Sequence, residues 1–153
     1  MTFYINICLY INMKKVAELF KVLSDVNRLR LLMVLDRKEL CVCQLMGIVG
    51  LSQPLVSRNL SILSRMGFLE ERKEGKLKFY RIKKDMTDEK RAIMELLRSA
   101  LSDDDVYLQD IEAVQDCTEF QKRTGRCDMD AFREFMRWRM EKKSKRDTRK
   151  EAV

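Results

Sequence analysis

Two cysteines separated by a single residue, Cys41 and Cys43, are the part of this sequence best suited to chemistry. Thiolates are soft ligands, and they bind thiophilic species such as trivalent arsenic. The pair begins a predicted helix over about 41–49, where the helix N-terminus is expected to lower the thiol pKa. On a regular helix these side chains point about 200° apart, so a chelate requires an irregular helix start or a distortion on binding. Two small buried hydrophobic residues are the alternative interpretation.

Three further cysteines, Cys8, Cys117 and Cys127, are spread along a chain that has no histidine. Without imidazole, the chain cannot build a zinc site of histidines and carboxylates. Cys117 and Cys127 flank a polar stretch that contains Gly125, and four roles stay open for them. They can supply a third thiolate to the Cys41 site, form a second soft-metal site, form a disulfide under oxidation, or be unrelated to it.

The spacing of apolar residues predicts that these thiols sit on a mainly helical fold with a small β-hairpin. One amphipathic helix ends near Ser24, and the next contains the run 29–35, which is apolar nearly all round and should be buried. The predicted helix 41–49, a turn at Gly50 and a helix over about 53–66 form a helix-turn-helix. Residues 68–73 and 76–82 then flank Glu74-Gly75 as a hairpin, which completes a winged helix-turn-helix.

An apolar stripe over Ile93–Leu101 has no partner left within so small a domain. We therefore expect this post-wing helix and the N-terminal helix, Val16–Leu23, to hold a homodimer. The organisation predicted for the chain has three parts: a leader of doubtful status at 1–12, which a start at Met13 would remove, a winged helix-turn-helix DNA-binding and dimerisation domain at 13–102, and a helical C-terminal extension with a basic tail at 103–153.

The net charge of +7 is unevenly distributed. Residues 68–84 carry seven positive and three negative charges, 85–119 carry three and eleven, and 137–150 carry eight and two. Separate basic faces indicate a polyanionic partner, although the basic tail is more typical of a solubilising end. Five cysteines, no signal peptide and no apolar run of membrane-spanning length predict a cytoplasmic protein with reduced thiols.

The second helix of the helix-turn-helix and the wing supply the side chains expected to meet double-stranded DNA. The first turns of such a helix reach base edges and flanking phosphates, and wing lysines suit backbone or minor-groove contact. The predicted DNA-binding residues are Ser52, Gln53, Ser57, Arg58, Asn59, Lys73, Lys76 and Lys78.

Over roughly 60 central residues the sequence resembles the arsenical-resistance repressor (ArsR) family, dimeric winged-helix proteins that leave DNA on binding a metal or metalloid. The resemblance lies in four stretches of the sequence, residues 24–32, 39–43, 52–58 and 75–81. The string Glu-Leu-Cys-Val-Cys at 39–43 is similar to that of the thiolate-sensing branch, which responds to arsenite, antimonite, cadmium or lead.

Three positions depart from the family pattern. Val26 stands where the family commonly has proline, and Asn59 where it often has histidine. Met46 occupies the place of the third cysteine of the arsenite-sensing pattern, so the resemblance leaves the third ligand to Cys117, Cys127 or Cys8. Cys8 would act across the dimer, as N-terminal cysteines do in the family's cadmium and lead sensors.

The sequence thus predicts a repressor that binds a palindromic operator as a dimer and is released by trivalent arsenic or antimony. It predicts no required cofactor, no membrane association and no enzyme, because a thiol oxidoreductase would need Cys-x-x-Cys near a βαβ unit. Two alternatives remain open. One is a winged-helix repressor that responds to thiol oxidation or persulfide, and the other is a protein-interaction adaptor on a degenerate winged helix.

Overall fold

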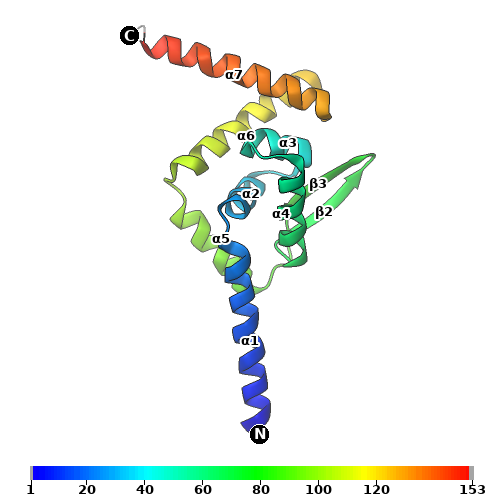
Figure 1. Ribbon diagram of the computed structural model, residues 1–153, viewed down its shortest axis with the longest axis vertical. Coiled ribbons are helices and arrows are strands. Elements are labelled where there is room, and N and C mark those ends of the chain that lie inside the picture. Colours follow the sequence, from blue (N-terminus) through cyan, green and yellow to red (C-terminus); the bar gives the residue numbers. More distant parts are fainter. Residues whose placement is uncertain (1, 152–153) are drawn as a thin grey trace.

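The computed structural model describes the backbone of residues 2–151 and the side chains of residues 13–149. It is mainly helical with one small antiparallel sheet (Figure 1). In chain order the elements are α1 (Thr2–Leu23), α2 (Val26–Arg37), β1 (Leu40–Cys41), α3 (Val42–Val49), α4 (Gln53–Arg65), β2 (Leu69–Glu74), β3 (Leu77–Ile82), α5 (Asp88–Ala100), α6 (Asp105–Thr124) and α7 (Met129–Glu151).

The predicted helix-turn-helix is confirmed as α3 and α4. Asp25 caps α2 by accepting a hydrogen bond from the Arg28 backbone N–H at 3.0 Å, which fixes the entry into the buried run 31–35. Gly50 ends α3 in the left-handed conformation, with φ of 68°, and donates its N–H to the Met46 carbonyl. Glycine adopts that conformation at little cost, so the chain can turn directly into α4.

The wing is also confirmed, with one addition. Strands β2 and β3 pair from Leu69 opposite Ile82 to Glu74 opposite Leu77, so Gly75 and Lys76 form the turn, one residue later than predicted. The sequence pattern does not predict β1, whose two residues pair with the other edge of β3, Cys41 opposite Phe79. Two residues are too few for an alternating pattern to show, and this short strand places Cys41 in the sheet.

The apolar core joins the winged helix to the two C-terminal helices. Leu31, Leu45, Leu60 and Phe68 have no exposed surface, and each such side chain contributes about 1.5 to 3 kcal/mol by its burial. Helix α6 adds Ala113, Val114, Cys117 and Phe120 to the same cluster, and α7 adds Ala131 and Phe135. In Figure 1, α7 crosses the top of the molecule above α3 and α6. The segment predicted as a helical C-terminal extension is therefore helical and packs on the helix-turn-helix.

Polar contacts also anchor the C-terminal helices. Arg30 of α2 donates two hydrogen bonds of 2.8 Å to the buried Asp110 of α6. Asp116, buried on α6, accepts a 2.6 Å hydrogen bond from Lys142 of α7. Buried carboxylates are costly unless they are paired, so these contacts fix α6 and α7 in one arrangement.

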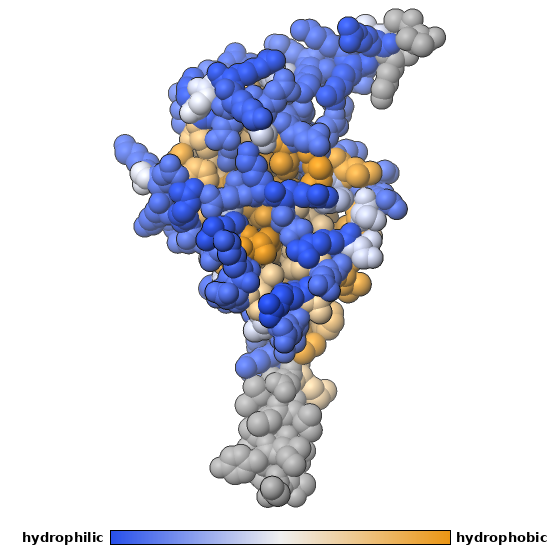
Figure 2. All heavy atoms as spheres, turned by 180° about the vertical axis from the view of Figure 1, so that it is seen from behind, coloured by the Kyte–Doolittle hydropathy of each residue, from blue (hydrophilic) through white to orange (hydrophobic). Residues whose placement is uncertain are grey.

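Helices α1 and α5 keep apolar side chains at the surface. Phe20 is 62% exposed and Leu96 is 63% exposed, whereas Met94 on the opposite side of α5 is fully buried. Figure 1 shows α1 projecting from the body of the molecule. In Figure 2 the C-terminal end is mostly hydrophilic, and apolar patches lie around the middle and toward α1. No helix within residues 2–151 is both long enough and apolar enough to cross a membrane.

Candidate metal centre and nucleic-acid interface

Cys41 sits at the junction of strand and helix. Its backbone is extended, with φ of −86° and ψ of 168°, and it occupies the N-cap position of α3. Only 1% of the residue is exposed. Its N–H donates to the Gln44 side-chain oxygen at 2.9 Å, and the Gln44 amide in turn donates to Gln121 of α6 at 2.9 Å. Cys41 therefore lies just before the first helical residue, Val42, and the separation of about 200° expected on a regular helix does not apply to the pair.

Cys127 is brought from the α6–α7 loop to Cys41. Their Sγ atoms are in bonding contact, and their Cα atoms are 7.7 Å apart. Disulfides usually join Cα atoms about 4.4 to 6.8 Å apart, so an unstrained disulfide here would require backbone movement. A shared metal ion needs less approach than a disulfide does. Two thiolate sulfur atoms that bind one zinc ion at about 2.3 Å in tetrahedral geometry are about 3.7 Å from each other.

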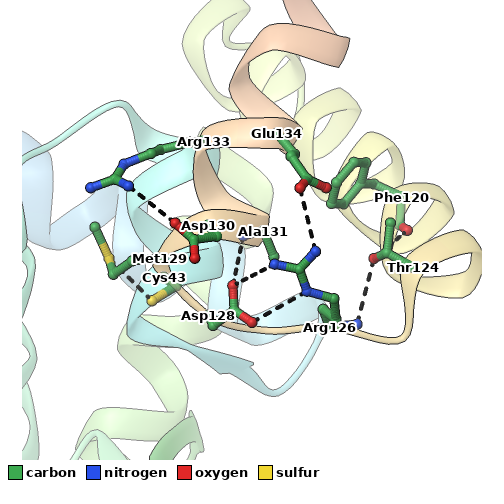
Figure 3. A network of polar contacts seen from close by, with 10 residues as sticks. All are labelled: Cys43, Phe120, Thr124, Arg126, Asp128, Met129, Asp130, Ala131, Arg133 and Glu134. Atoms are coloured by element: carbon green, nitrogen blue, oxygen red, sulfur yellow. Dashed lines mark hydrogen bonds and ion pairs between the residues drawn. The ribbon is translucent and has the colours of Figure 1, made fainter.

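The loop that carries Cys127 is held by a network of charged side chains, drawn in Figure 3. Arg126 donates to both Asp128 and Glu134 at 3.3 Å. Asp128 also caps α7 by accepting from the Ala131 N–H at 2.7 Å. Gly125, with φ of 64°, ends α6 and lets the chain reverse toward α3. These bonds fix the position of Cys127 relative to α7.

Cys43 is the second residue of α3 and is half-buried, with a free thiol. Its Sγ atom is 3.7 Å from the Sδ atom of Met129, the first residue of α7 (Figure 3). Burial raises the pKa of the Cys43 thiol, and the nearby Asp128 carboxylate raises it further. Cys43 lies at a helix N-terminus, where a lowered pKa was expected, yet desolvation raises its pKa.

The remaining ligand candidates occupy different environments. Cys117 is buried on α6, and burial raises its pKa to about 11. It lines a cavity of about 20 Å³ together with Cys43 and Cys127, which is room for one water-sized atom. Met46, at the position of the missing third cysteine, is part of the apolar core. Cys8 lies outside the described side chains.

Among the side chains of residues 13–149, no three Cys, Asp or Glu groups form a ready-made metal site. Cys127 contacts Cys41 and lines the same cavity as Cys43. Cys127 is thus near both other thiols, whereas Cys41 and Cys43 are not in contact with each other. Closing all three thiols on one ligand requires a rearrangement in the first turn of α3. Because Cys41 lies outside the helix, such a rearrangement is local.

A polar stripe runs along the exposed side of α4. Gln53, Ser57, Ser61 and Arg65 recur at intervals of four residues and line one groove with Lys76 and Lys78 of the wing. The same groove, about 730 Å³ in volume, is lined at one end by Cys41 and Cys43. Ser61 and Arg65 were missed at the sequence level, although their four-residue spacing from Ser57 was a usable signal.

Of the other residues expected to contact DNA from α4 and its N-cap, two are exposed and one is buried. Ser52 is the exposed N-cap residue, and its side chain makes no capping bond, while Arg58 is exposed and has no ion-pair partner within the described residues. Asn59 is different. It is only 6% exposed, and its Oδ1 atom accepts a 3.3 Å hydrogen bond from Arg28. The prediction that Asn59 faces DNA is wrong, because its side chain points into the junction with α2.

The wing concentrates positive charge. Lys73 lies opposite Lys78 across the hairpin, and Lys76 is in the turn between them; all three are exposed. Lys78 has one acidic neighbour, Glu71, at 3.5 Å. Like charges directly opposite each other destabilise a hairpin. An anionic partner such as a phosphate backbone would remove that repulsion.

Comparison with known proteins supports the interpretation of this surface as a DNA-binding helix-turn-helix and wing. Residues 25–71 match the family described as bacterial regulatory protein, arsR family. The arsenic resistance transcriptional regulator ArsR2 of Pseudomonas putida is 35% identical over 94 residues, which are 61% of this chain and 79% of that protein. The chain belongs to the arsR family. As a member of it, the chain is related to transcriptional regulators and not to enzymes.

Two further arsR-type relatives were found, one by sequence and one by structure. The arsenical resistance operon repressor of Escherichia coli K12 is 44% identical over 66 residues, 42% of this chain and 56% of that repressor. The chain thus spans little more than half the length of that relative. The solution structure of the homodimeric winged helix-turn-helix DNA-binding domain of Mb0332 from Mycobacterium bovis is 28% identical. It covers 63% of this chain and 85% of its own, with a TM-score of 0.50.

Proposed function

We propose that this arsR-family protein is a homodimeric repressor that leaves its operator when trivalent arsenic or antimony binds Cys41, Cys43 and Cys127. The single observation that carries the proposal is the contact between Cys127 and Cys41, at a site whose usual third position holds Met46. Trivalent arsenic is thiophilic, and we expect it to take up to three thiolates. Cys127 supplies the donor that the α3 sequence lacks.

Cys127 is better placed than the other two candidates. Cys117 faces the same cavity as Cys43, but it belongs to the middle of α6, which is held rigidly by the Arg30–Asp110 pair. Cys127 lies in a loop and already touches Cys41. Because of this contact Cys127 needs little movement to share a ligand with Cys41, whereas moving Cys117 would disturb the core.

The position of the site couples it to the DNA-contacting surface. Cys41 belongs to β1, which pairs with the wing strand β3, and it also begins α3, which packs against α4. A ligand that draws Cys43 toward Cys41 and Cys127 therefore pulls on the wing and on the helix-turn-helix together. A coupling free energy of about 1 to 3 kcal/mol would weaken operator binding about 5- to 150-fold.

The test is arsenite-induced release of a fluorescent operator fragment, followed by anisotropy with fully reduced protein. Cys127→Ser should bind the operator as the wild type does but resist release, because serine keeps the size and removes the soft donor. Cys117→Ala is the matched control and should be released normally. Wild-type release of Cys127→Ser, or loss of release in Cys117→Ala alone, would contradict the ligand assignment.

The Cys41–Cys127 contact also supports the second candidate function, a repressor that responds to thiol oxidation or persulfide. Oxidation would join the same two sulfur atoms, although the 7.7 Å between their Cα atoms must first shorten. Mass spectrometry after treatment with arsenite or with a mild oxidant separates the two. A metalloid sensor gains one arsenic atom and loses three thiol hydrogens at low arsenite, and a redox sensor loses two hydrogens or gains sulfur first.

The proposal includes a palindromic operator in double-stranded DNA and a cytoplasmic location. A homodimer presents two copies of α4 related by a two-fold axis, and such a protein fits an operator with two inverted half-sites. Thiols that must stay reduced to bind arsenic suit the cytoplasm.

A further inference from the structure

Two cysteines of one segment face a cysteine and a methionine of another. Cys41 and Cys43 of the α3 start are separated by one residue, and so are Cys127 and Met129 at the start of α7. The structure pairs the first members, with Cys41 and Cys127 in contact, and the second members, with Cys43 and Met129 sulfur atoms 3.7 Å apart. Four sulfur atoms are thus brought together from two segments that are 86 residues apart in sequence.

Burial of an apolar side chain explains the position of Met129 only in part. The residue remains 39% exposed, yet its sulfur lies beside that of Cys43 (Figure 3). The Asp128 cap and the Arg126 network fix the backbone on the N-terminal side of Met129. The thioether is therefore held beside a thiol by contacts made by its neighbours in the chain.

A thioether changes which ions the site suits. It is a neutral, soft donor, and Cys thiolates together with Met thioethers favour Cu(I). Trivalent arsenic is satisfied by thiolates alone, so it has no need of Met129. A site of three thiols and one thioether can hold a monovalent soft cation with two, three or four sulfur donors, and each thiol that binds releases its proton to solvent.

We propose that Cys41, Cys43, Cys127 and Met129 form a binding site for Cu(I), in which the Met129 thioether is a ligand for the copper ion and not for arsenic. The site shares its thiols with the proposed arsenic site and rests on that proposed function for its effect on DNA. Its ligand set differs by one sulfur atom, and that difference makes it separately testable.

The experiment titrates fully reduced, full-length protein with Cu(I) under anaerobic conditions, in competition with the chromophoric chelator bathocuproine disulfonate. Met129→Leu keeps the volume and removes the sulfur. Loss of a second-shell partner alone costs about 10- to 100-fold in metal affinity, so loss of a direct ligand should weaken Cu(I) binding at least about tenfold. Met140→Leu, on the same helix and 70% exposed, is the matched control and should bind as the wild type does.

Arsenite titration of the same proteins separates this proposal from the previous one. Met129→Leu should bind arsenite with wild-type affinity while it loses affinity for Cu(I). Equal Cu(I) affinity of Met129→Leu and the wild type overturns the copper site, whatever arsenite does. Wild-type protein that binds Cu(I) through Met129 but no arsenite would overturn the proposed function and leave the copper site standing.

Discussion

Gly47, in the middle of α3, is a point of close approach between α7 and the helix-turn-helix. A Cβ atom at this position would lie 2.8 Å from Cδ1 and 2.9 Å from Cε1 of the Phe135 ring. Phe135 is only 3% exposed and packs against Phe120, so the ring has little room to withdraw. Gly47→Ala is therefore expected to push α7 away from α3.

Two opposing effects set how much Gly47→Ala changes the stability of the protein. Alanine is favoured over glycine within a helix by about 1 kcal/mol, whereas overpacking a core contact costs about 1 to 3 kcal/mol. The net change in global stability is therefore small, at most about 2 kcal/mol. The strain falls on the docking of α7, which positions Cys127 next to Cys41. Up to about 3 kcal/mol at this contact would lower arsenite affinity by up to about 150-fold, while operator binding through α4 and the wing stays near normal.

The assay is arsenite titration of reduced Gly47→Ala beside the double variant Gly47→Ala/Phe135→Leu. The smaller leucine makes room for the added methyl group, so the double variant should recover most of the lost affinity. Circular dichroism checks that both remain folded. Arsenite affinity of Gly47→Ala equal to that of the wild type would refute the idea that the docking of α7 on α3 controls the site.

Two other predictions test the DNA and dimer surfaces. Arg58→Ala should weaken operator binding by about 1 to 3 kcal/mol at fixed salt and leave arsenite binding intact, measured against Lys122→Ala on α6; unchanged operator affinity would remove Arg58 from the interface. Leu96→Glu should convert dimers to monomers with little operator affinity in analytical ultracentrifugation, because Leu96 is 63% exposed in one protomer and its charge would be buried in the dimer. A dimeric Leu96→Glu, or a monomeric wild type, would exclude the α1 and α5 faces as the interface.

Much of the fold was predictable because its signals are local. The turn at Gly50 and the hairpin around Gly75 each depend on a few adjacent residues, and the structure confirms them. Strand β1 was not predictable, since two residues carry no periodicity. The packing of α6 and α7 on α3 depends on pairs such as Arg30 and Asp110, which are 80 residues apart in the chain.

The candidate site shows the same division. Cys41 and Cys43 were identifiable from their spacing, whereas the short strand in which Cys41 is extended was not. Which distant thiol approaches them could not be decided, since Cys117 and Cys127 lie on the same segment of the chain and only the turn at Gly125 separates their directions. Asn59 was misplaced because the exposed and buried sides of α4 differ by one residue, and Arg28, its partner, is 31 residues away.

The identity of the third thiolate is measured most directly by X-ray absorption at the arsenic edge, on reduced protein loaded with one equivalent of arsenite. The wild type and Cys117→Ala should each show three sulfur atoms bound to arsenic. Cys127→Ser should show two sulfur atoms and one oxygen, together with loss of arsenite-induced operator release. Three sulfur atoms around arsenic in Cys127→Ser would contradict the proposal that Cys127 completes the site.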